Sequence, residues 1–366
     1  MFHKCTQKNK DGTITNVICN SAKNGLIPQR DFFDKDIANT ENTAGYYIIK
    51  NNDFVYNPRK SNEAPYGPVS IYKYAEDGIV SPLYLCFRAI NSLCADYFEM
   101  YFKSSAWHRY IYLMGDSGAR HDRVSIKDEV FFDMPVRMPS LPEQEKIAAF
   151  LSLVDARIEK QRQLVEALKK YKRGYFQRII SAFDTHEYMV SDIVEEYNKK
   201  TKIQNEYPIL SSTMSGIKLQ NDYFNKQAAS EDTVGYKIVP NGYFTYRSMS
   251  DTGEFHFNLQ NVIENGIVSP AYPVFKVVNN NSEFVEYILN ETDEIKSQLL
   301  IKKEGGTRYA LSFSKFKSLK ISLPSIEMQN KFVIQLNLID SILNIETGTY
   351  EALQKMKKGF LQQMFI

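Results

Sequence analysis

The sequence is poor in the residues that build disulfide frameworks and metal centres. It has 4 cysteines and 5 histidines among 366 residues. The cysteines all lie in the first quarter and form no Cys-x-x-Cys pair, so we expect reduced thiols in a cytoplasmic protein. No histidine pairs with a cysteine or carboxylate at metal-ligand spacing, and we expect no metal site.

Long apolar runs and a strong charge excess are also missing. No segment approaches the ~20 apolar residues of a membrane-spanning helix, and the N-terminal MFHKCTQKNKDG has no apolar core of a secretory signal. The net charge is +2, smaller than the excess typical of non-specific polyanion binders. This charge permits DNA binding through one basic face but does not argue for it.

Catalytic and cofactor signatures are absent as well. There is no Gly-x-Gly-x-x-Gly after a strand and no phosphate-binding Gly-x-x-x-x-Gly-Lys-Ser/Thr loop. A methyltransferase would need an Asn/Asp-Pro-Pro-aromatic motif, and the nearest segment, Asn57-Pro58-Arg59, lacks the second proline and the aromatic residue. We therefore predict no cofactor and no catalysis by this chain alone.

What the chain does contain is an internal repeat. The segment Ser21–Phe33 (SAKNGLIPQRDFF) parallels Ser212–Phe224 (STMSGIKLQNDYF). Gly78–Pro82 (GIVSP) returns unchanged as Gly266–Pro270, and further matched segments keep the same order along the chain. A repeat of this kind predicts two copies of one structural unit. Because the GIVSP segments are identical, we expect them to serve the shared fold.

Each copy opens with short β-like runs and turns, over residues 1–140 and 184–323. A helical stretch follows these runs in each copy, near residues 91–112 and 282–302. This pattern predicts an α+β protein with two mixed α/β domains.

Each copy closes with a long helix, over residues 141–183 and 324–366. Apolar residues recur at alternating spacings of four and three, with polar gaps at Gln161 and Lys172 in one helix and at Glu346 and Lys357 in the other. Such a seam is typical of a coiled coil. We predict that the two helices pair antiparallel within the chain; a dimerisation coiled coil is the alternative. The seam residues are Ile147, Leu151, Val154, Ile158, Val165, Leu168, Tyr175 and Ile179, and Phe332, Leu336, Ile339, Leu343, Tyr350, Leu353, Phe360 and Met364.

The helices also carry motifs of a known family. Leu141–Ile147 (LPEQEKI), running into a helix that ends at Leu168–Gly174 (LKKYKRG), resembles the central conserved region of type I restriction-modification specificity (S) subunits. The run from Leu323-Pro324-Ser325 to Lys357–Phe365 (KKGFLQQMF) is similar to that family's distal conserved region. Gly305–Arg308 (GGTR) resembles the Gly-Thr/Ser-Arg segment that precedes it, and the resemblance covers nearly the whole chain.

The resemblance implies a function. Residues 1–140 and 184–323 would be two target recognition domains, each binding one half of a bipartite sequence in double-stranded DNA. The helices would set the spacing between them and dock two methyltransferase (M) subunits, and a restriction (R) subunit would join for cleavage. Adenine methylation and cleavage would belong to these partners, so the chain itself would be non-catalytic.

One departure concerns the start of the first copy. The second copy begins with residues 188–196 (YMVSDIVEE), which predict an opening strand and a turn. Alignment of the first copy reaches Met1 before this segment is matched. The first domain therefore lacks a counterpart of the opening segment. Three explanations stay open: a truncated chain, a late start, or a first domain that is closed in another way.

Candidate DNA-contacting residues follow from the chemistry of base and phosphate recognition, which uses arginine, lysine and amide side chains. The repeated Gly-x-Arg loop is the first choice, and the loop after the second strand of each copy is the second. The alternatives are an arginine that braces its domain and an ordinary solvated hairpin tip. The candidates are Arg120, His121, Arg123, Arg308 and Tyr309 in the first group, and Asn57, Arg59, Lys60, Arg247 and Ser248 in the second.

Two other functions fit the sequence. One is a scaffold, such as a silent specificity cassette that binds partner subunits through its helices. The other is a DNA-binding regulator unrelated to restriction, which would need no methyltransferase. Co-purification with a methyltransferase and footprinting of a split site distinguish all three.

Overall fold

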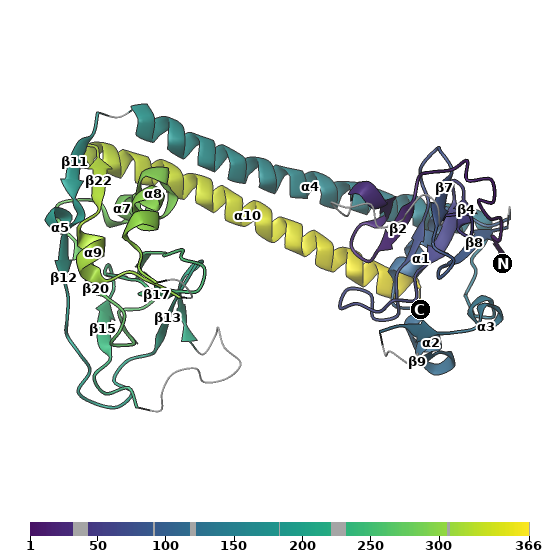
Figure 1. The fold of residues 1–366 in the computed structure, drawn as a ribbon, viewed down its shortest axis with the longest axis horizontal. Helices are drawn as coiled ribbons and strands as arrows, with labels where there is room; N and C mark the ends of the chain where they lie inside the picture. Colours follow the sequence, from purple (N-terminus) through teal and green to yellow (C-terminus); the bar gives the residue numbers. More distant parts are fainter. Residues whose placement is uncertain are drawn as a thin grey trace. The chain divides into compact units, whose positions relative to one another are not determined.

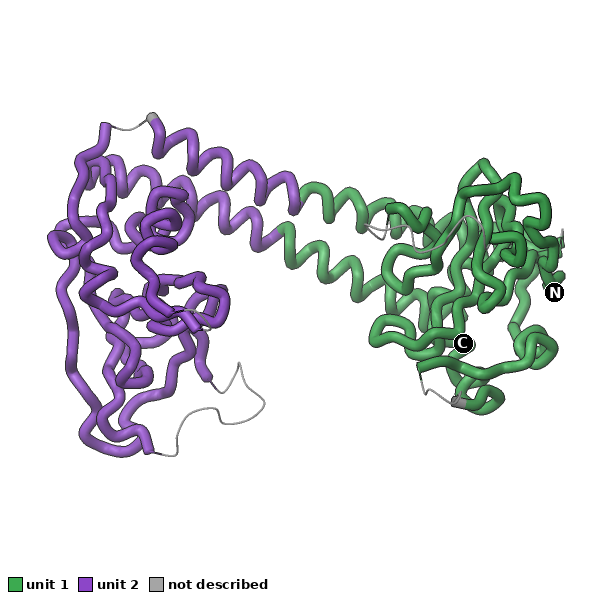
Figure 2. Tube along the Cα trace, viewed as in Figure 1, with its two compact units in different colours: residues 1–164, 346–366 green, residues 165–345 purple. Residues whose placement is uncertain are grey.

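The computed structural model describes residues 1–31, 43–90, 92–117, 122–182, 184–220, 232–305 and 308–365. It shows an α+β fold with two β-rich domains and two long helices, as predicted (Figure 1). The chain divides into two compact units: unit 1 comprises residues 1–164 and 346–366, and unit 2 comprises residues 165–345 (Figure 2). The four-segment division made from the sequence stays a prediction, because these units cut through both long helices.

Unit 1 is built on a four-stranded antiparallel sheet in the order β1-β8-β5-β6. The pairs β2–β3, β4–β7 and β9–β10 accompany it. Its strands are β1 Phe2–Lys4, β2 Ile18–Ser21, β3 Gly25–Pro28, β4 Tyr47–Ile49, β5 Asp53–Tyr56, β6 Val69–Ile71, β7 Gly78–Val80, β8 Leu85–Ala89, β9 Asp116–Ser117 and β10 Val124–Ser125. Its helices are η1 Gln29–Asp31, α1 Ala95–Lys103, α2 His108–Met114 and α3 Asp128–Phe132.

Unit 2 repeats this plan with the antiparallel sheet β12-β20-β16-β18 and the pairs β13–β14, β15–β19 and β17–β21. A further pair, β11–β22, joins its opening segment to its end. Its strands are β11 His186–Met189, β12 Val194–Glu196, β13 Leu210–Thr213, β14 Gly216–Leu219, β15 Lys237–Pro240, β16 Phe244–Thr245, β17 Met249–Ser250, β18 Asn258–Leu259, β19 Asn265–Val268, β20 Val274–Val277, β21 Tyr309–Ala310 and β22 Lys320–Leu323. Its helices are α5 Val190–Ile193, α7 Ser282–Glu291, α8 Asp293–Lys302 and α9 Phe313–Lys317.

The centre of each sheet carries the same stacked pair of phenylalanines. The rings of Phe54 and Phe87 lie 5.3 Å apart in unit 1, with an interplanar angle of 11°. Those of Phe244 and Phe275 lie 5.1 Å apart in unit 2, at 10°. All four side chains are fully buried. Because a buried aromatic residue removes roughly 150–250 Å² from water, each pair is a large part of its domain's core.

The identical Gly-Ile-Val-Ser-Pro segments serve the fold, as predicted. The isoleucine and valine of both copies are fully buried. A Cβ on Gly78 would lie 2.7 Å from Cγ1 of Ile18, and a Cβ on Gly266 would lie 2.4 Å from Cδ1 of Leu210. Both neighbours belong to the adjoining hairpin, β2–β3 or β13–β14. Glycine is therefore required where this hairpin packs over the sheet.

The predicted seams form the buried faces of the two long helices, α4 (Leu141–Ala182) and α10 (Ile326–Met364). Every predicted seam position on both helices is buried or half-buried. In each unit, residues closer to the C-terminal end of α4 contact residues closer to the N-terminal end of α10. The paired segments therefore run antiparallel, as predicted (Figure 1). In unit 2 the rings of Tyr175 and Phe332 stack in the seam, whereas in unit 1 the seam residue Phe360 is contacted by the exposed ring of Phe150.

One polar gap of each helix meets the other within unit 1. Gln161 is only 3% exposed. Its Nε2 donates to the Glu346 carbonyl oxygen at 3.0 Å and to Glu346 Oε2 at 2.5 Å. The sequence placed both residues at the same step of their seams. The structure shows that the Gln161 side chain and Glu346 are hydrogen-bond partners across the helix pair.

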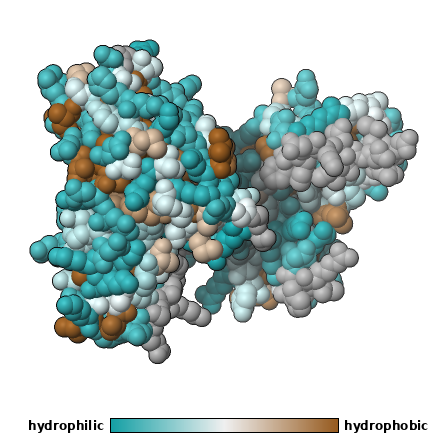
Figure 3. Space-filling model, turned by 60° about the vertical axis from the view of Figure 1, so that its left-hand side comes forward, coloured by the Kyte–Doolittle hydropathy of each residue, from teal (hydrophilic) through white to brown (hydrophobic). Residues whose placement is uncertain are grey.

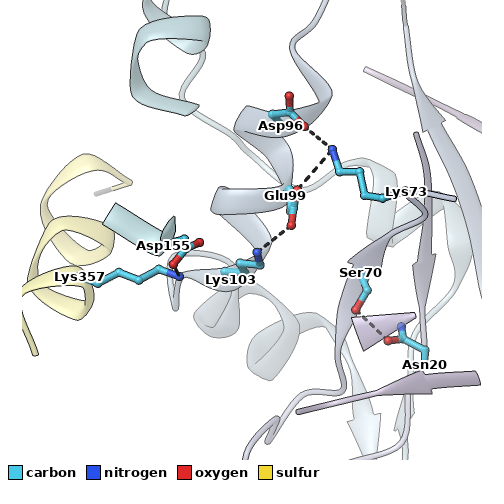
Figure 4. A network of polar contacts seen from close by, with 8 residues as sticks. All are labelled: Asn20, Ser70, Lys73, Asp96, Glu99, Lys103, Asp155 and Lys357. Carbon is cyan, nitrogen blue, oxygen red and sulfur yellow. Dashed lines mark hydrogen bonds and ion pairs between the residues drawn. The ribbon is translucent and has the colours of Figure 1, made fainter. Parts of the chain in front are cut away.

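The other two gaps are lysines, and each pairs with an aspartate of the facing helix. Lys357 forms an ion pair with Asp155 in unit 1 (Figure 4). In unit 2, Lys172 Nζ lies 2.6 Å from Asp340 Oδ1. A polar group that finds its partner in only one register specifies that register. These pairs therefore align the helices within each unit.

A buried glutamine fastens the first turn of each long helix to its own domain. Gln144 Oε1 accepts a hydrogen bond from Cys94 N at 3.0 Å, and its Nε2 donates to the Pro139 carbonyl at 2.9 Å. Gln329 makes the same two bonds in unit 2, at 2.9 Å each, to the residues that precede α7 and α10. Both glutamines are buried, so a slip of either helix would leave amide atoms without partners.

In the described part of the chain, no helix is long and apolar enough to cross a membrane. On the face of unit 2 turned forward in Figure 3, apolar side chains form small separate groups among hydrophilic ones. The four cysteines are free thiols. No cluster of His, Cys, Asp or Glu that could hold a metal occurs among the residues described.

Glu286 on α7 has an unusual environment in unit 2. Its Oε1 accepts a hydrogen bond from Leu259 N at 2.8 Å, and burial raises the pKa of this carboxyl to about 7. The equivalent residue in unit 1, Glu99, instead pairs with Lys73 and Lys103 (Figure 4). Glu286 forms no ion pair with a lysine among the residues of unit 2 that the structure describes.

We predict a pH dependence from Glu286. The unfolded chain loses this proton near the ordinary pKa of 4.5, whereas folded unit 2 keeps it to about pH 7. The free energy of unfolding therefore falls as the pH rises from about 4.5 to 7. Glu286→Gln should flatten this fall and raise the Tm at pH 7.5, measured by thermal denaturation at pH 5 and 7.5. Glu99→Gln, the matched control, should bring no gain; an unchanged pH profile in Glu286→Gln contradicts the prediction.

Candidate nucleic-acid interface

In unit 1, the loop after β5 is bonded to the segment that leads into β10. The Lys60 backbone N donates to the Asp122 carbonyl at 2.8 Å. Arg59 and Arg123 face each other in an antiparallel bridge. The two groups of candidates predicted from distant parts of the sequence therefore meet in one place. We call this junction the clamp of unit 1.

Unit 2 has the same clamp. Val124 N donates to the Pro58 carbonyl in unit 1, and Leu311 N donates to the Ser248 carbonyl in unit 2, at 2.9 Å in both cases. In unit 2 the contact is extended into the strand pair β17–β21. Both units therefore share this long-range backbone pairing, although no sequence motif predicts it.

The unit 2 clamp brings two predicted arginines to one carboxylate. Arg308 Nε lies 3.0 Å from Asp251 Oδ1, and Arg247 Nη2 lies 3.7 Å from Asp251 Oδ2. In unit 1 the corresponding contact is looser, with Arg59 Nε 3.9 Å from Asp122 Oδ2. About half or more of each of these arginine side chains is exposed. The ion pairs orient the guanidinium groups without removing them from solvent.

A hollow lies over each clamp. Arg59, Lys60 and Arg123 line the hollow of unit 1. Arg247 and Arg308 line that of unit 2, where the lining also includes the acidic residues Asp251 and Glu254. Arginine presents fixed pairs of donors that match guanine edges and phosphates. Both hollows can therefore bind an anionic surface that offers hydrogen-bond acceptors. Because only the hollow of unit 2 also has acidic residues, the two hollows favour ligand surfaces that differ in charge and hydrogen-bonding groups.

Asn57 is held inside the fold of its loop. Its Nδ2 donates to the Asn20 carbonyl at 3.1 Å, and its Oδ1 accepts from Arg59 N at 3.1 Å. Asn20 is itself buried and accepts from Ser70 Oγ at 2.8 Å (Figure 4). Asn57 thus braces the turn that presents Arg59.

Two further candidates also have partners. The Tyr309 ring lies under Lys303, whose Nζ is 4.1 Å from the ring centroid. Ser248 contributes its carbonyl to the unit 2 clamp. Arg120 and His121 lie outside the described residues. Trp107 is buried and donates from its indole nitrogen to the Phe102 carbonyl at 3.0 Å, as expected for a core residue.

The sequence-based selection missed a repeated glutamine. Gln29 lines the hollow of unit 1 and Gln220 that of unit 2. Gln220 is buried, and its Oε1 has no hydrogen-bond partner among the described residues. The match of Gln29 with Gln220 within the repeated segments is the sequence signal for this position, but identity between copies by itself indicates a role in the shared fold.

Comparisons with known proteins place this geometry in a family. Residues 2–170 match the family model of the type I restriction modification DNA specificity domain. Residues 2–170 therefore belong to the family of type I restriction modification DNA specificity domains. This family is the DNA specificity component of its system, so the prediction of a non-catalytic chain is confirmed at the level of the family. The internal repeat extends the same organisation to the second half of the chain.

A curated relative and solved structures agree. The chain is 22% identical over 190 residues to the type I restriction enzyme HindI specificity subunit of Haemophilus influenzae; the match covers 50% of this chain and 41% of that protein, less than half of its length. The fold is similar to the HsdS subunit of Thermoanaerobacter tengcongensis, with a TM-score of 0.52, 14% identity, and 99% and 93% of the two chains covered. It is also similar to the S subunit from M. genitalium, with a TM-score of 0.53, 14% identity, and 100% and 93% covered.

Proposed function

We propose that this specificity subunit binds a bipartite sequence in double-stranded DNA, with one half-site read by the hollow of each unit. The observation that carries the proposal is the repeated clamp, which joins two distant basic segments in both units. Hydrogen bonds from arginine and lysine to base edges give sequence choice, and their contacts to phosphates give affinity. Because the hollows differ in their acidic residues, the two half-sites differ in sequence.

The chemistry belongs to partner subunits in this proposal. Two methyltransferase subunits methylate adenine, and a restriction subunit joins for cleavage. A solved structure of 13% identity and TM-score 0.56, covering 87% of this chain and 83% of that one, concerns complex assembly and conformational transition of the type I restriction-modification system. It supports an assembly of this kind for the present chain.

The long helices set the gap between half-sites. A helix of 42 residues, such as α4, is roughly 60 Å long at 1.5 Å per residue. Reading heads on one face of B-DNA, one turn apart, need about 34 Å. The paired lysines and glutamine of the seam keep the helix register fixed, which a spacer requires.

The outer face of the helices offers a docking site for each methyltransferase. Leu153 on α4 and Leu338 on α10 both follow the buried glutamine of their helix by nine residues, and they are 71% and 63% exposed. In unit 2, exposed Ile334 and Ile342 flank Leu338 at helical spacing. One equivalent apolar site per unit fits two copies of one partner.

The half-site assignment is tested by arginine substitutions in complexes of the chain with its methyltransferase. Arg59→Ala with Arg123→Ala should weaken binding only to duplexes carrying the half-site of unit 1, by about 10- to 100-fold, since a bidentate arginine contact contributes ~1–3 kcal/mol. Arg308→Ala should do the same for the other half-site. Fluorescence anisotropy with one half-site randomised at a time measures this, after methylome sequencing defines the target. Lys331→Ala on α10 is the control; equal losses on both half-sites would sink the assignment.

Helix length should determine the gap. Inserting one heptad into both α4 and α10 lengthens the pair by about 10 Å, or roughly three base pairs. We expect the preferred gap in the methylated sequence to increase while each half-site is unchanged, as read by methylome sequencing. A preferred gap that stays the same in a stable variant would show that the helices do not set it.

The docking face should control stoichiometry. Leu153→Glu and Leu338→Glu should each leave one methyltransferase bound, and the double variant none, as measured by native mass spectrometry of co-expressed complexes. Asn344→Glu, which changes an exposed polar residue of α10 in the same way, should retain both copies. Full stoichiometry in the double variant would rule out this face as the docking site.

A further inference from the structure

Each unit carries a short β-hairpin that leads to the hollow over its clamp. β2 and β3 form this hairpin in unit 1, and β13 and β14 form it in unit 2. Ile18 and Leu210 hold equivalent places at the base of the two hairpins, because each lies against the glycine of its Gly-Ile-Val-Ser-Pro segment. Counting from these two residues aligns the first strands of the hairpins position by position.

The base of each hairpin is fastened to the edge strand of the sheet by one buried asparagine. In unit 1 the asparagine is on the hairpin, where Asn20 Oδ1 accepts a hydrogen bond from Ser70 Oγ on β6 at 2.8 Å (Figure 4). In unit 2 it is on the strand, where Asn258 Nδ2 on β18 donates to Ser212 Oγ at 2.7 Å. The partners have changed places between the units and the bond is kept. It holds both hairpins in the same orientation.

The equivalence of these partners follows from the strand registers. Asn20 and Ser212 each lie two residues after the aligned base residue of their hairpin. Ser70 and Asn258 each precede the residue that pairs with the first stacked phenylalanine of their sheet. The hairpins are therefore placed alike on two sheets that have the same plan.

The tips of the two hairpins differ in length and chemistry. Three exposed residues turn between the paired strands in unit 1, and only two do so in unit 2. The tip of unit 1 is Ala22, Lys23 and Asn24, and the tip of unit 2 is Met214 and Ser215. Met214 is 60% exposed, which is a large fraction for an apolar side chain at the end of a turn. Below a base that is fastened alike, the tip is thus the part of the hairpin that diverges.

Both tips reach the hollow over the clamp. Ala22 lines this hollow in unit 1, and both tip residues line it in unit 2. All three tip residues of unit 1 also line a second, adjoining hollow, together with Lys73 and Lys103. The tip of unit 1 therefore lies at the border of two hollows, and both hollows have basic side chains in their lining.

A two-stranded ridge beside basic hollows matches the major groove of B-DNA. This groove is roughly 12 Å wide and admits a two-stranded β-ribbon, with the phosphates of one strand on each side. Basic side chains beside the ridge can contact phosphates, while the residues at its tip reach the edges of the bases. The residues at the tip then determine which bases are accepted.

The two tips offer different chemistry to base edges. The ammonium group of Lys23 suits the O6 and N7 acceptors of guanine, and the amide of Asn24 suits N6 and N7 of adenine. Met214 has no hydrogen-bond donor, and its apolar surface suits the methyl group of thymine. The tip of unit 1 thus favours purines, whereas the tip of unit 2 favours a thymine.

We propose that the hairpin tips are specificity-determining segments, which enter the major groove and select bases within each half-site. Lys23 and Asn24 select neighbouring purines in the half-site of unit 1, and Met214 selects a thymine in the half-site of unit 2. This inference rests on the proposed binding of a bipartite DNA sequence. Arginines are common to both clamps, whereas the tips differ, so the tips give each half-site bases of its own.

The variant Lys23→Met with Asn24→Ser gives the tip of unit 1 the chemistry of unit 2. It is co-expressed with the methyltransferase, and methylome sequencing should show one or two neighbouring purine positions changed or relaxed in the half-site of unit 1 only. Fluorescence anisotropy should show at least a tenfold loss of affinity for the original duplex and little change for a duplex with both half-sites randomised.

A reciprocal variant and a control complete the experiment. Met214→Lys should change the half-site of unit 2 and leave that of unit 1 as it is. Lys10→Met, which alters an exposed residue of unit 1 that lines neither hollow, should change neither half-site. All the substituted side chains are exposed, so the Tm of each variant should equal that of the unaltered chain.

The unaltered complex separates this inference from the proposed function. A methylome without any bipartite target would reject the proposed function, and the tip assignment with it. A bipartite target that stays the same in both tip variants would overturn the tip assignment alone. An equal loss of affinity for the original and the randomised duplex would also overturn it, because such a loss indicates contacts with phosphates and not with bases.

Discussion

The structure depends on reciprocal completion of its two cores. Unit 1 takes residues 346–366 from the end of the chain, and unit 2 takes residues 165–182 from the first long helix. Phe365 contacts Tyr97 and Tyr101 in unit 1, with ring centroids 5.2 and 5.8 Å apart, and Phe176 contacts Phe332 in unit 2 at 5.7 Å. Unit 1 is built from two separate stretches of the sequence and unit 2 from one stretch that includes parts of both long helices, so the helices are part of both cores as well as connections. The buried pair of Gln161 with Glu346 and the two lysine–aspartate pairs add specificity to this packing, because apolar contacts alone do not define a register.

The long helices and the repeat could be predicted from the sequence, and the clamps could not. A heptad repeat is a local pattern, and the positions of its apolar residues predict which face of the helix is buried. Seam residues such as Leu151 and Leu336 are buried, as this pattern predicts. The clamp depends on bonds such as Val124 to Pro58, between segments with no pattern in common. Sequence chemistry identified Arg59, Arg123, Arg247 and Arg308 as candidates one by one. Their meeting in pairs, and the carboxylate of Asp251 between two of them, required the fold.

Divergence between the two units is concentrated away from the shared core. Phe54 and Phe87 keep nearly the same stacking geometry as Phe244 and Phe275. The charged residues that line the hollow of unit 1 are all basic, whereas the lining of the unit 2 hollow also includes acidic residues. The surface can vary between the two copies because the stability of each domain comes from shared features below it: the hairpin, the closely packed glycine (Gly78 or Gly266) beneath it, and the stacked phenylalanine rings. The surface over the clamp is then free to differ between the two units.

The exchange of helical segments has a consequence for synthesis of the chain. A nascent protein lacks Leu361 and Phe365 until both long helices have been synthesised, although residues 1–164 of the same unit are made much earlier. The amino-terminal domain is therefore the last to gain its full core. A stop codon within the final turns of α10 would therefore remove core residues of unit 1, which lies farthest from it in the gene, and leave the core of unit 2 intact.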